Sequence, residues 1–149
     1  MLIVKDLMSH ELYTLKPTDT VQQARELMLK QQIRHIPIVN EDNELLGLVS
    51  KRDVLAASVS TLADLQENER NEIESHIPIS KIMIEAVVIA EENTHLIETA
   101  RFMLETKQGC LPVMSESKLV GVLTEADFVR LSLFLLKKMA EYENINSCS

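Results

Sequence analysis

The stretch Gly47-Leu-Val-Ser50-Lys-Arg-Asp53 recurs later in the chain as Gly121-Val-Leu-Thr124-Glu-Ala-Asp127. Both copies place a glycine, two apolar residues and a hydroxyl residue before an aspartate, and both join an apolar run to a stretch with helical spacing. A single Ser-x-x-Asp would indicate little. Two copies in matched settings predict a duplicated structural unit with two equivalent sites.

The repeat extends on both sides of this motif. An offset of about 75 residues places Asp6-Leu7-Met8 on Lys81-Ile82-Met83, and Ile36-Pro37-Ile38 on Leu111-Pro112-Val113. The turn that follows is one residue shorter in the second copy, which aligns the two glycines and the two aspartates. Two copies of so long a period favour a paired module over a solenoid of many short repeats.

Composition limits the class of protein. The chain has 149 residues, 46% of them apolar, which is enough for one sizeable core or two joined halves. A net charge of -8 opposes binding to nucleic acid and to acidic membranes, both of which need clustered basic residues. No signal peptide or long apolar span is evident. We expect a cytoplasmic protein with no nucleic-acid or membrane partner.

The cysteines and histidines do not form a metal site by their spacing. Cys110 lies in an apolar segment and Cys148 in the polar tail, and neither has the spacing of a metal ligand or of a disulfide framework. The four histidines are scattered, with no HxH or HxxxH pattern. P-loop, GxSxG and HExxH motifs are absent. The sequence therefore predicts no metal, no catalytic residues and no enzyme activity.

Each repeat reads as strand, helix, strand, strand, helix. In the first copy we expect a short strand over 12–15, a helix capped by Thr20, a hairpin of 36–39 with 45–49, and a helix from Ser50 to about residue 57. The predicted organisation is a first repeat over 1–58, an acidic, solvated helix or linker over 59–77, a second repeat over 78–132, and a C-terminal helix and polar tail over 133–149. Apolar residues on more than one face of that last helix also predict a homodimer.

These features resemble the cystathionine beta-synthase (CBS) domain family, whose members occur as tandem pairs. The likeness spans residues 4–130 and rests on the two lead-in segments, the apolar-Pro-apolar strands and both Gly-x-x-Ser/Thr-x-x-Asp motifs. The stretch 109–113 is also similar to small free-standing bacterial CBS pairs. The resemblance implies an α/β fold of two tandem β-α-β-β-α units packed with pseudo-twofold symmetry, with adenosyl ligands in clefts between them.

The resemblance also assigns roles to residues that match the family pattern. Asp53 and Asp127 would accept hydrogen bonds from ribose hydroxyls, and Ser50 and Thr124 would lie near the ribose or first phosphate. The two motif glycines would let a ligand approach the backbone. Apolar walls around adenine would come from two further sets of residues, namely the Pro strands at Ile36, Pro37, Leu111 and Pro112, and the first strands at Tyr13, Thr14, Val88 and Ile89.

The two copies differ in charge where a phosphate would lie. The first has Lys51 and Arg52 in the motif and Arg34 before the Pro strand, whereas the second has Glu125-Ala126 and Gly109-Cys110. The first site is therefore expected to favour AMP, ADP or ATP. The second would take a less anionic adenosyl compound, with S-adenosylmethionine as a secondary candidate, or bind weakly, or stay empty. No obligatory cofactor is expected.

Two alternatives stay open. Ser50-x-x-Asp53 and Thr124-x-x-Asp127 are also good helix caps, a role that needs no ligand. At the level of function, the chain is either a non-catalytic module that relays adenosyl-ligand binding to an unidentified effector protein, or a constitutive dimerisation and protein-interaction module with no physiological ligand.

Overall fold

The computed structural model describes residues 1–62 and 66–147 of the chain, so residues 63–65 of the predicted linker and Cys148 lie outside the described residues. The chain forms two compact units, each built around one motif. The first-motif unit comprises Glu11–Val88 with Ser115–Leu119, and the second-motif unit comprises Met1–His10, Ile89–Met114 and Val120–Ser149. The predicted α/β class is confirmed, because each unit combines helices with strands.

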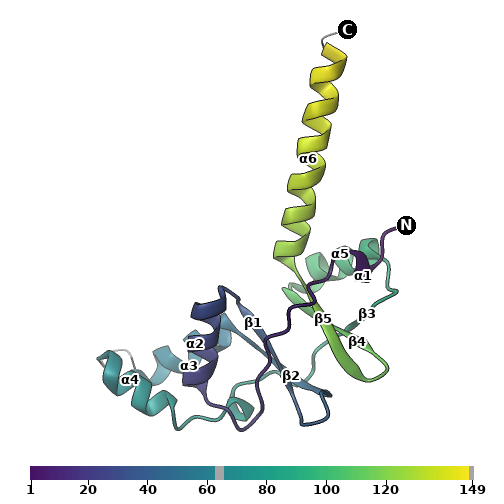
Figure 1. Ribbon diagram of the computed structural model, residues 1–149. Helices are drawn as coiled ribbons and strands as arrows, with labels where there is room; N and C mark the ends of the chain where they lie inside the picture. The colour runs from purple at the N-terminus through teal and green to yellow at the C-terminus, as the bar shows by residue number, and fades with distance from the viewer. Residues whose placement is uncertain (63–65, 148–149) are drawn as a thin grey trace. The chain divides into compact units, whose positions relative to one another are not determined.

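The first-motif unit consists of two helices on a hairpin, followed by a further helix (Figure 1). In chain order its elements are α2 (Val21–Gln31), β1 (His35–Val39), β2 (Leu45–Ser50), α3 (Lys51–Leu62), α4 (Glu67–Glu74) and a 3-10 turn (Ile79–Lys81). The antiparallel register pairs Ile36 with Val49, so the expected hairpin is confirmed. The expected strand over 12–15 is wrong: this segment forms only one parallel bridge, between Leu15 and Ile38.

Local sequence explains why α2 begins and ends where it does. The hydroxyl of Thr20 accepts a hydrogen bond from the amide of Gln23, and the side chain of Gln23 accepts one from the amide of Thr20, which confirms the predicted cap. At the other end Gln32 adopts the left-handed conformation with φ of 56°. The inward face of the helix joins the core of the unit, whose buried apolar members are Val21, Ala24, Met28, Ile36, Ile38, Val49, Val54 and Ile79.

The second-motif unit repeats this plan. Its elements are α1 (Val4–Leu7), β3 (Ala90–Glu91), α5 (Leu96–Thr106), α6 (Glu125–Ser147), and all of β4 (Cys110–Ser115) and β5 (Lys118–Thr124) except the residues within Ser115–Leu119. The strand order is β3-β4-β5, with β3 parallel to β4. The first strand of this copy was expected at Val88 and Ile89 but lies at the next two residues. The core is formed by Val4, Met8, Ala90, Leu96, Met103, Leu111, Val113 and Leu123.

The compact units do not follow the order of the repeats along the chain. The first ten residues pack in the second-motif unit, where the amide of Val4 donates to the carbonyl of Thr94 at 2.8 Å. Residues 78–88 instead complete the first-motif unit, where the amide of Leu48 donates to the carbonyl of Ile84 at 2.9 Å. Residues 1–10, which lead into the first repeat, therefore pack on the second motif. Residues 78–88, which lead into the second repeat, pack on the first motif.

Helix α4 in the acidic segment is not wholly solvated, contrary to expectation. Glu74 at its C-terminal end is 0% exposed, and its Oε1 accepts hydrogen bonds from Arg25 on α2 and from Ser58 on α3. Burying a carboxylate requires a paired cation and hydrogen bonds, and these two residues provide both. The segment therefore braces the helices of the first-motif unit.

Helix α6 is longer than expected. The sequence predicted a C-terminal helix and polar tail over 133–149, whereas the structure has one uninterrupted helix from Glu125 to Ser147 (Figure 1). Large apolar side chains on it are exposed, among them Leu136 at 61% and Tyr142 at 68%. Among the helices that the structure describes, none combines the length and apolarity needed to cross a membrane.

Candidate functional site

The first motif forms a closed cap at the start of α3. Asp53 Oδ2 accepts hydrogen bonds from the amide of Ser50 at 2.8 Å and from its hydroxyl at 2.9 Å, while the amide of Asp53 donates to the same hydroxyl at 3.2 Å. The capping role is therefore present in the structure. Asp53 Oδ1 makes no hydrogen bond or ion pair with any described residue, and the side chain is only half-buried. One acceptor oxygen of this carboxylate is available to a ligand.

The second motif also caps its helix, but the other carboxylate oxygen of its aspartate has a protein partner. Asp127 Oδ2 accepts from the amide of Thr124 at 2.8 Å, and Asp127 Oδ1 forms an ion pair with Arg130 at 3.0 Å. Asp127 is 7% exposed. Both of its carboxylate oxygens are therefore engaged within the protein. The corresponding position of the first copy is Ala56, which has no group to pair with Asp53.

A buried thiol accompanies the second motif. Cys110, at the start of β4, is fully buried. Burial, and to a lesser degree the nearby Asp127 carboxylate, raises the pKa of the Cys110 thiol from 9.0 to about 12. A thiol in this setting stays protonated and is a poor nucleophile at neutral pH. The equivalent position of the first copy is His35.

A cavity of about 350 Å³ opens between α2 and α3 of the first-motif unit. Arg34 and Lys51 line it together with Arg25, so three cationic side chains border a wall that is otherwise apolar except for Gln32. The amide of Lys51 donates to the carbonyl of Arg34 at 2.8 Å, which holds these two residues side by side. The remaining lining residues are Met28, Leu29, Gln32, Ile33, Val54 and Leu55.

The motif glycines allow close packing of the lead-in segments, residues 1–10 and 78–88, against the motifs. A Cβ on Gly47 would lie 2.9 Å from the carbonyl oxygen of Ile84 and 3.0 Å from the sulfur of Met83. On Gly121 it would lie 2.8 Å from the sulfur of Met8. Protein atoms already fill the space that the missing side chains leave.

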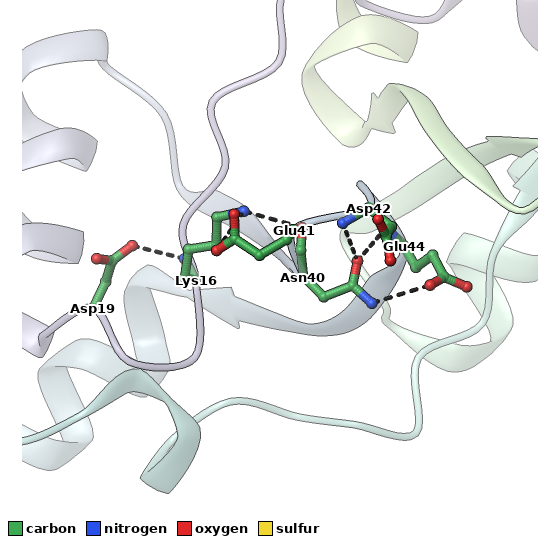
Figure 2. Close-up of polar contacts among 6 residues, drawn as sticks. All are labelled: Lys16, Asp19, Asn40, Glu41, Asp42 and Glu44. Atoms are coloured by element: carbon green, nitrogen blue, oxygen red, sulfur yellow. Dashed lines mark hydrogen bonds and ion pairs between the residues drawn. The ribbon is translucent and has the colours of Figure 1, made fainter.

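Tyr13 and Thr14 are held near the hairpin through their neighbour Lys16. Figure 2 shows its ammonium group donating to the carbonyl of Asn40 at 3.0 Å, and its amide donating to Asp19 at 2.7 Å. The Asn40 side chain in turn accepts from the amides of Asp42 and Glu44, both at 2.9 Å, which closes the hairpin turn. Tyr13 and Thr14 are half-buried and directly precede Leu15, which bridges Ile38 of β1 in parallel register.

The other predicted residues divide by exposure. Ile36, Pro37, Leu111 and Pro112 are buried in their respective cores, so their side chains are not exposed to a ligand in these units. Val88 and Ile89 are 47% and 43% exposed. Arg52 is exposed, and Arg34 is the one member of the predicted set that lines the cavity. Across the described ranges, no three His, Cys, Asp or Glu side chains gather where they could hold a metal ion.

Two contacts near the motifs were missed by sequence reasoning. Arg130 lies three positions after Asp127 on the same helix, a spacing that predicts an ion pair and could have been noticed. The contact of Arg25 with Glu74 joins residues 49 positions apart, and no local pattern announces it.

Comparison with known proteins identifies the fold. The CBS domain profile matches residues 4–60 and 79–133, so the chain belongs to the CBS domain family and contains a tandem pair. A putative acetoin utilization protein, AcuB, from Vibrio cholerae is 36% identical with a TM-score of 0.78, covering 95% of this chain and 97% of that one.

Two other solved structures carry ligands. Arabidopsis thaliana CBSX2 in complex with AMP is 28% identical, with a TM-score of 0.75 over 91% of this chain and 98% of that one. The CBS pair of MJ0100, in complex with 5'-methylthioadenosine and S-adenosyl-L-methionine, is 26% identical, with a TM-score of 0.73 over 88% and 95%. The chain spans 60% and 42% of the lengths of two curated relatives to which it is 33% identical.

Proposed function

Because the chain is a tandem CBS pair, we propose that it is a non-catalytic regulatory module that binds an adenosine-containing ligand and relays its binding state to an effector protein. The observation that carries the proposal is the half-engaged carboxylate of Asp53. Its Oδ2 is fixed by the helix cap, which orients Oδ1 toward a ligand at no further entropic cost. Solved relatives that bind AMP, 5'-methylthioadenosine and S-adenosylmethionine support the ligand class.

Charge around the first motif favours a phosphorylated adenosine. Arg34, Lys51 and Arg52 supply three cations at or beside the start of α3, where the helix dipole also favours an anion. AMP, ADP or ATP is therefore the proposed ligand of this motif. Asp53 would accept from the ribose hydroxyls, with Ser50 near the first phosphate and Tyr13-Thr14 beside the base.

The second motif has fewer free polar and cationic groups with which to bind a ligand. Asp127 is paired with Arg130, and Glu125 stands where the first motif has Lys51. We expect this motif to take a less anionic adenosyl compound such as S-adenosylmethionine, or to stay empty. Leu111 and Pro112 would contribute to any such site through their backbone, because their side chains are buried, whereas Val88 and Ile89 are exposed enough to contribute their side chains.

One observation favours a second function. Helix α6 exposes many large apolar residues, which suits a constitutive dimerisation or protein-interaction module with no physiological ligand. The two functions are compatible in a homodimer whose ligand changes how an effector binds. Ligand binding itself distinguishes them.

Calorimetric titration of nucleotide-stripped protein with AMP, and separately with adenosine, tests the proposal. Asp53→Asn should weaken both ligands, because a ribose contact is common to them. Arg52→Ala should weaken AMP about tenfold or more and leave adenosine unchanged, since a charge-assisted hydrogen bond contributes about 1.5–3 kcal/mol. Arg101→Ala, which removes an exposed arginine of α5, is the matched control and should affect neither.

Three results would reject the ligand-sensing function or its assignment. Absence of heat and of a thermal shift with AMP, ATP, adenosine and S-adenosylmethionine would leave the interaction module as the function. Equal losses of AMP and adenosine in Arg52→Ala would remove the phosphate role of that residue. Loss in Asp127→Asn but not in Asp53→Asn would move the site to the second motif.

A further inference from the structure

The cavity between α2 and α3 is separate from the proposed adenosyl site. Lys51, Val54 and Leu55 line it from α3, and Asp53 lies about 100–160° around that helix from each of them. The volume of the cavity, about 350 Å³, falls in the range of small-molecule pockets. All of its lining residues belong to the first-motif unit, in which α2 and α3 lie side by side (Figure 1). This unit therefore forms the cavity by itself.

The cavity combines unpaired cations with accessible apolar side chains. The side chains of Arg34 and Lys51 form no hydrogen bond or ion pair with residues 1–62 or 66–147. Leu29 and Leu55, which also line the cavity, are 63% and 49% exposed. An anion is attracted to the two cations, and an apolar group is favoured beside the two leucines. The lining therefore suits an anion that carries an apolar body.

The third cation of the cavity, Arg25, has a different state. Its Nη2 atom donates to Glu74 and to Ser58, so its charge is already paired within the unit. Its Nε atom is buried and has no hydrogen-bond partner among the described residues, which leaves one donor unused. The anionic group of a ligand therefore belongs beside Arg34 and Lys51, while Arg25 keeps a donor for a further polar atom.

The second copy shows that the fold does not need these cations. At the three equivalent positions it has Ala100, Gly109 and Glu125. It nevertheless builds the same succession of helix, hairpin and helix. The apolar position of Leu29 is kept in that copy as Leu104. The cluster of three cations is therefore specific to the first copy and is not a requirement of the shared plan.

We propose that this cavity is a second ligand site, which binds a small amphipathic anion, that is, a carboxylate or phosphate group joined to an aliphatic or aromatic body. The anionic group binds between the side chains of Arg34 and Lys51, and the apolar body packs along Leu29 and Leu55. The proposal does not depend on adenosyl binding, because Asp53 does not line the cavity.

Calorimetric titration of the nucleotide-stripped full chain with octanoate tests the proposal. For a ligand of this size, a fitted site corresponds to a Kd of roughly 0.1–1 mM. 1-Octanol should bind at least about tenfold more weakly, because it forms no charge-assisted hydrogen bond. Inorganic phosphate should also bind at least about tenfold more weakly, because it buries no apolar surface.

Variants locate the binding site. Lys51→Met and Arg34→Met should each weaken octanoate about five- to tenfold and leave 1-octanol unchanged. Leu29→Ala should weaken both ligands about threefold, because it removes apolar contact. Lys30→Met, at an α2 position that does not line the cavity, and Leu104→Ala are the matched controls and should change neither ligand. Circular dichroism should be unchanged throughout, since all five side chains are exposed.

Four results would overturn the second site. They are an absence of octanoate binding, 1-octanol or phosphate binding as tightly as octanoate, unchanged octanoate affinity in both Lys51→Met and Leu29→Ala, and equal losses in the control variants. The third would place octanoate elsewhere, such as on the exposed apolar side chains of α6. Octanoate binding without any adenosyl binding would instead reject the proposed function and leave this site in place.

Discussion

The two motif units share one plan but differ in how far the protein itself engages the carboxylate of the motif aspartate. Asp53 Oδ1 has no partner among the residues that the structure describes, whereas the equivalent oxygen of Asp127 pairs with Arg130. Position 56 of the first copy is an alanine. A duplicated motif therefore need not mean two equivalent sites, because one substitution a helical turn away changes what the aspartate can accept.

The helix pairs differ as well. Arg25 on α2 reaches the buried Glu74 of α4, while the equivalent position on α5 is Ala100. The α2–α3 pair is thus braced by a third helix of its own unit. Among the described residues no third helix braces α5 in this way, and many large apolar side chains of α6 are exposed. In the first-motif unit a third helix packs on the helices, whereas in the second-motif unit apolar residues of α6 stay exposed to solvent.

The largest expected effect comes from breaking the brace. Glu74→Ala leaves the largely buried guanidinium of Arg25 without its carboxylate, and should lower the free energy of unfolding by about 3 kcal/mol. Glu141→Ala removes a partner from an exposed ion pair with Lys138 and should cost less than about 1 kcal/mol. Urea unfolding with an unchanged slope measures both. Equal losses in the two variants would show that Glu74 does not brace the unit.

A smaller effect should follow from exchanging the residues next to the aspartates. Ala56→Arg places a guanidinium one turn beyond Asp53, as Arg130 lies beyond Asp127, and should engage Oδ1. Adenosine affinity at the first motif is then expected to fall about fivefold, because losing one hydrogen bond costs roughly 1 kcal/mol. Adenosine serves better than AMP here because it carries no phosphate for the new arginine to attract.

Ala56→Leu is the control for bulk at the same exposed position. Calorimetric titration should show adenosine affinity close to that of wild type in this variant. The reciprocal change, Arg130→Ala, frees Asp127 Oδ1 and should cost less than about 1 kcal/mol of stability, since the Arg130 side chain is 73% exposed. If Ala56→Leu weakens adenosine as much as Ala56→Arg, steric exclusion rather than carboxylate engagement would explain the loss.

Short-range patterns predicted the local structure well. The cap at Thr20, the hairpin pairing Ile36 with Val49, and the helix start at Ser50 each depend on residues a few positions apart, where side-chain chemistry acts directly. The repeat predicted two matched units, and the resemblance of its motifs to the CBS family predicted the tandem fold. The strand expected over 12–15 was wrong because its β-formers find only one partner position, at Ile38.

Long-range packing could not be predicted from those patterns. The roles of Gly47 and Gly121 depend on lead-in segments that pack on the motif of the other repeat, an exchange that sequence order conceals. The burial of Glu74 depends on a cation far away in sequence. The difference between the two aspartates was predictable only in part. The spacing of Asp127 and Arg130 suggests an ion pair, but only the structure shows which carboxylate oxygen that pair occupies.

The smallest expected effect is a dependence of folding stability on pH that comes from Cys110 in the second copy. Since burial holds the pKa of Cys110 at about 12 against 9.0 in the unfolded chain, only the unfolded state ionises this thiol as the pH first rises. Its contribution to stability is therefore complete below about pH 8, declines by about 0.4 kcal/mol at pH 9, and continues to fall by up to ~1.4 kcal/mol per pH unit toward the folded pKa. His35, the equivalent residue in the first copy, contributes no such thiol.

Urea unfolding of wild type and Cys110→Ala between pH 7 and about 9.5 isolates this contribution, because every other titrating group is common to the two proteins. Cys110→Ala should be less stable at pH 7, since it loses a buried sulfur, but the gap between the two proteins should narrow as the pH rises. A gap that stays constant across this range would mean that the Cys110 thiol ionises equally in the folded and unfolded chains. The second motif would then be open to solvent, and the difference between the two aspartates would rest on Arg130 alone.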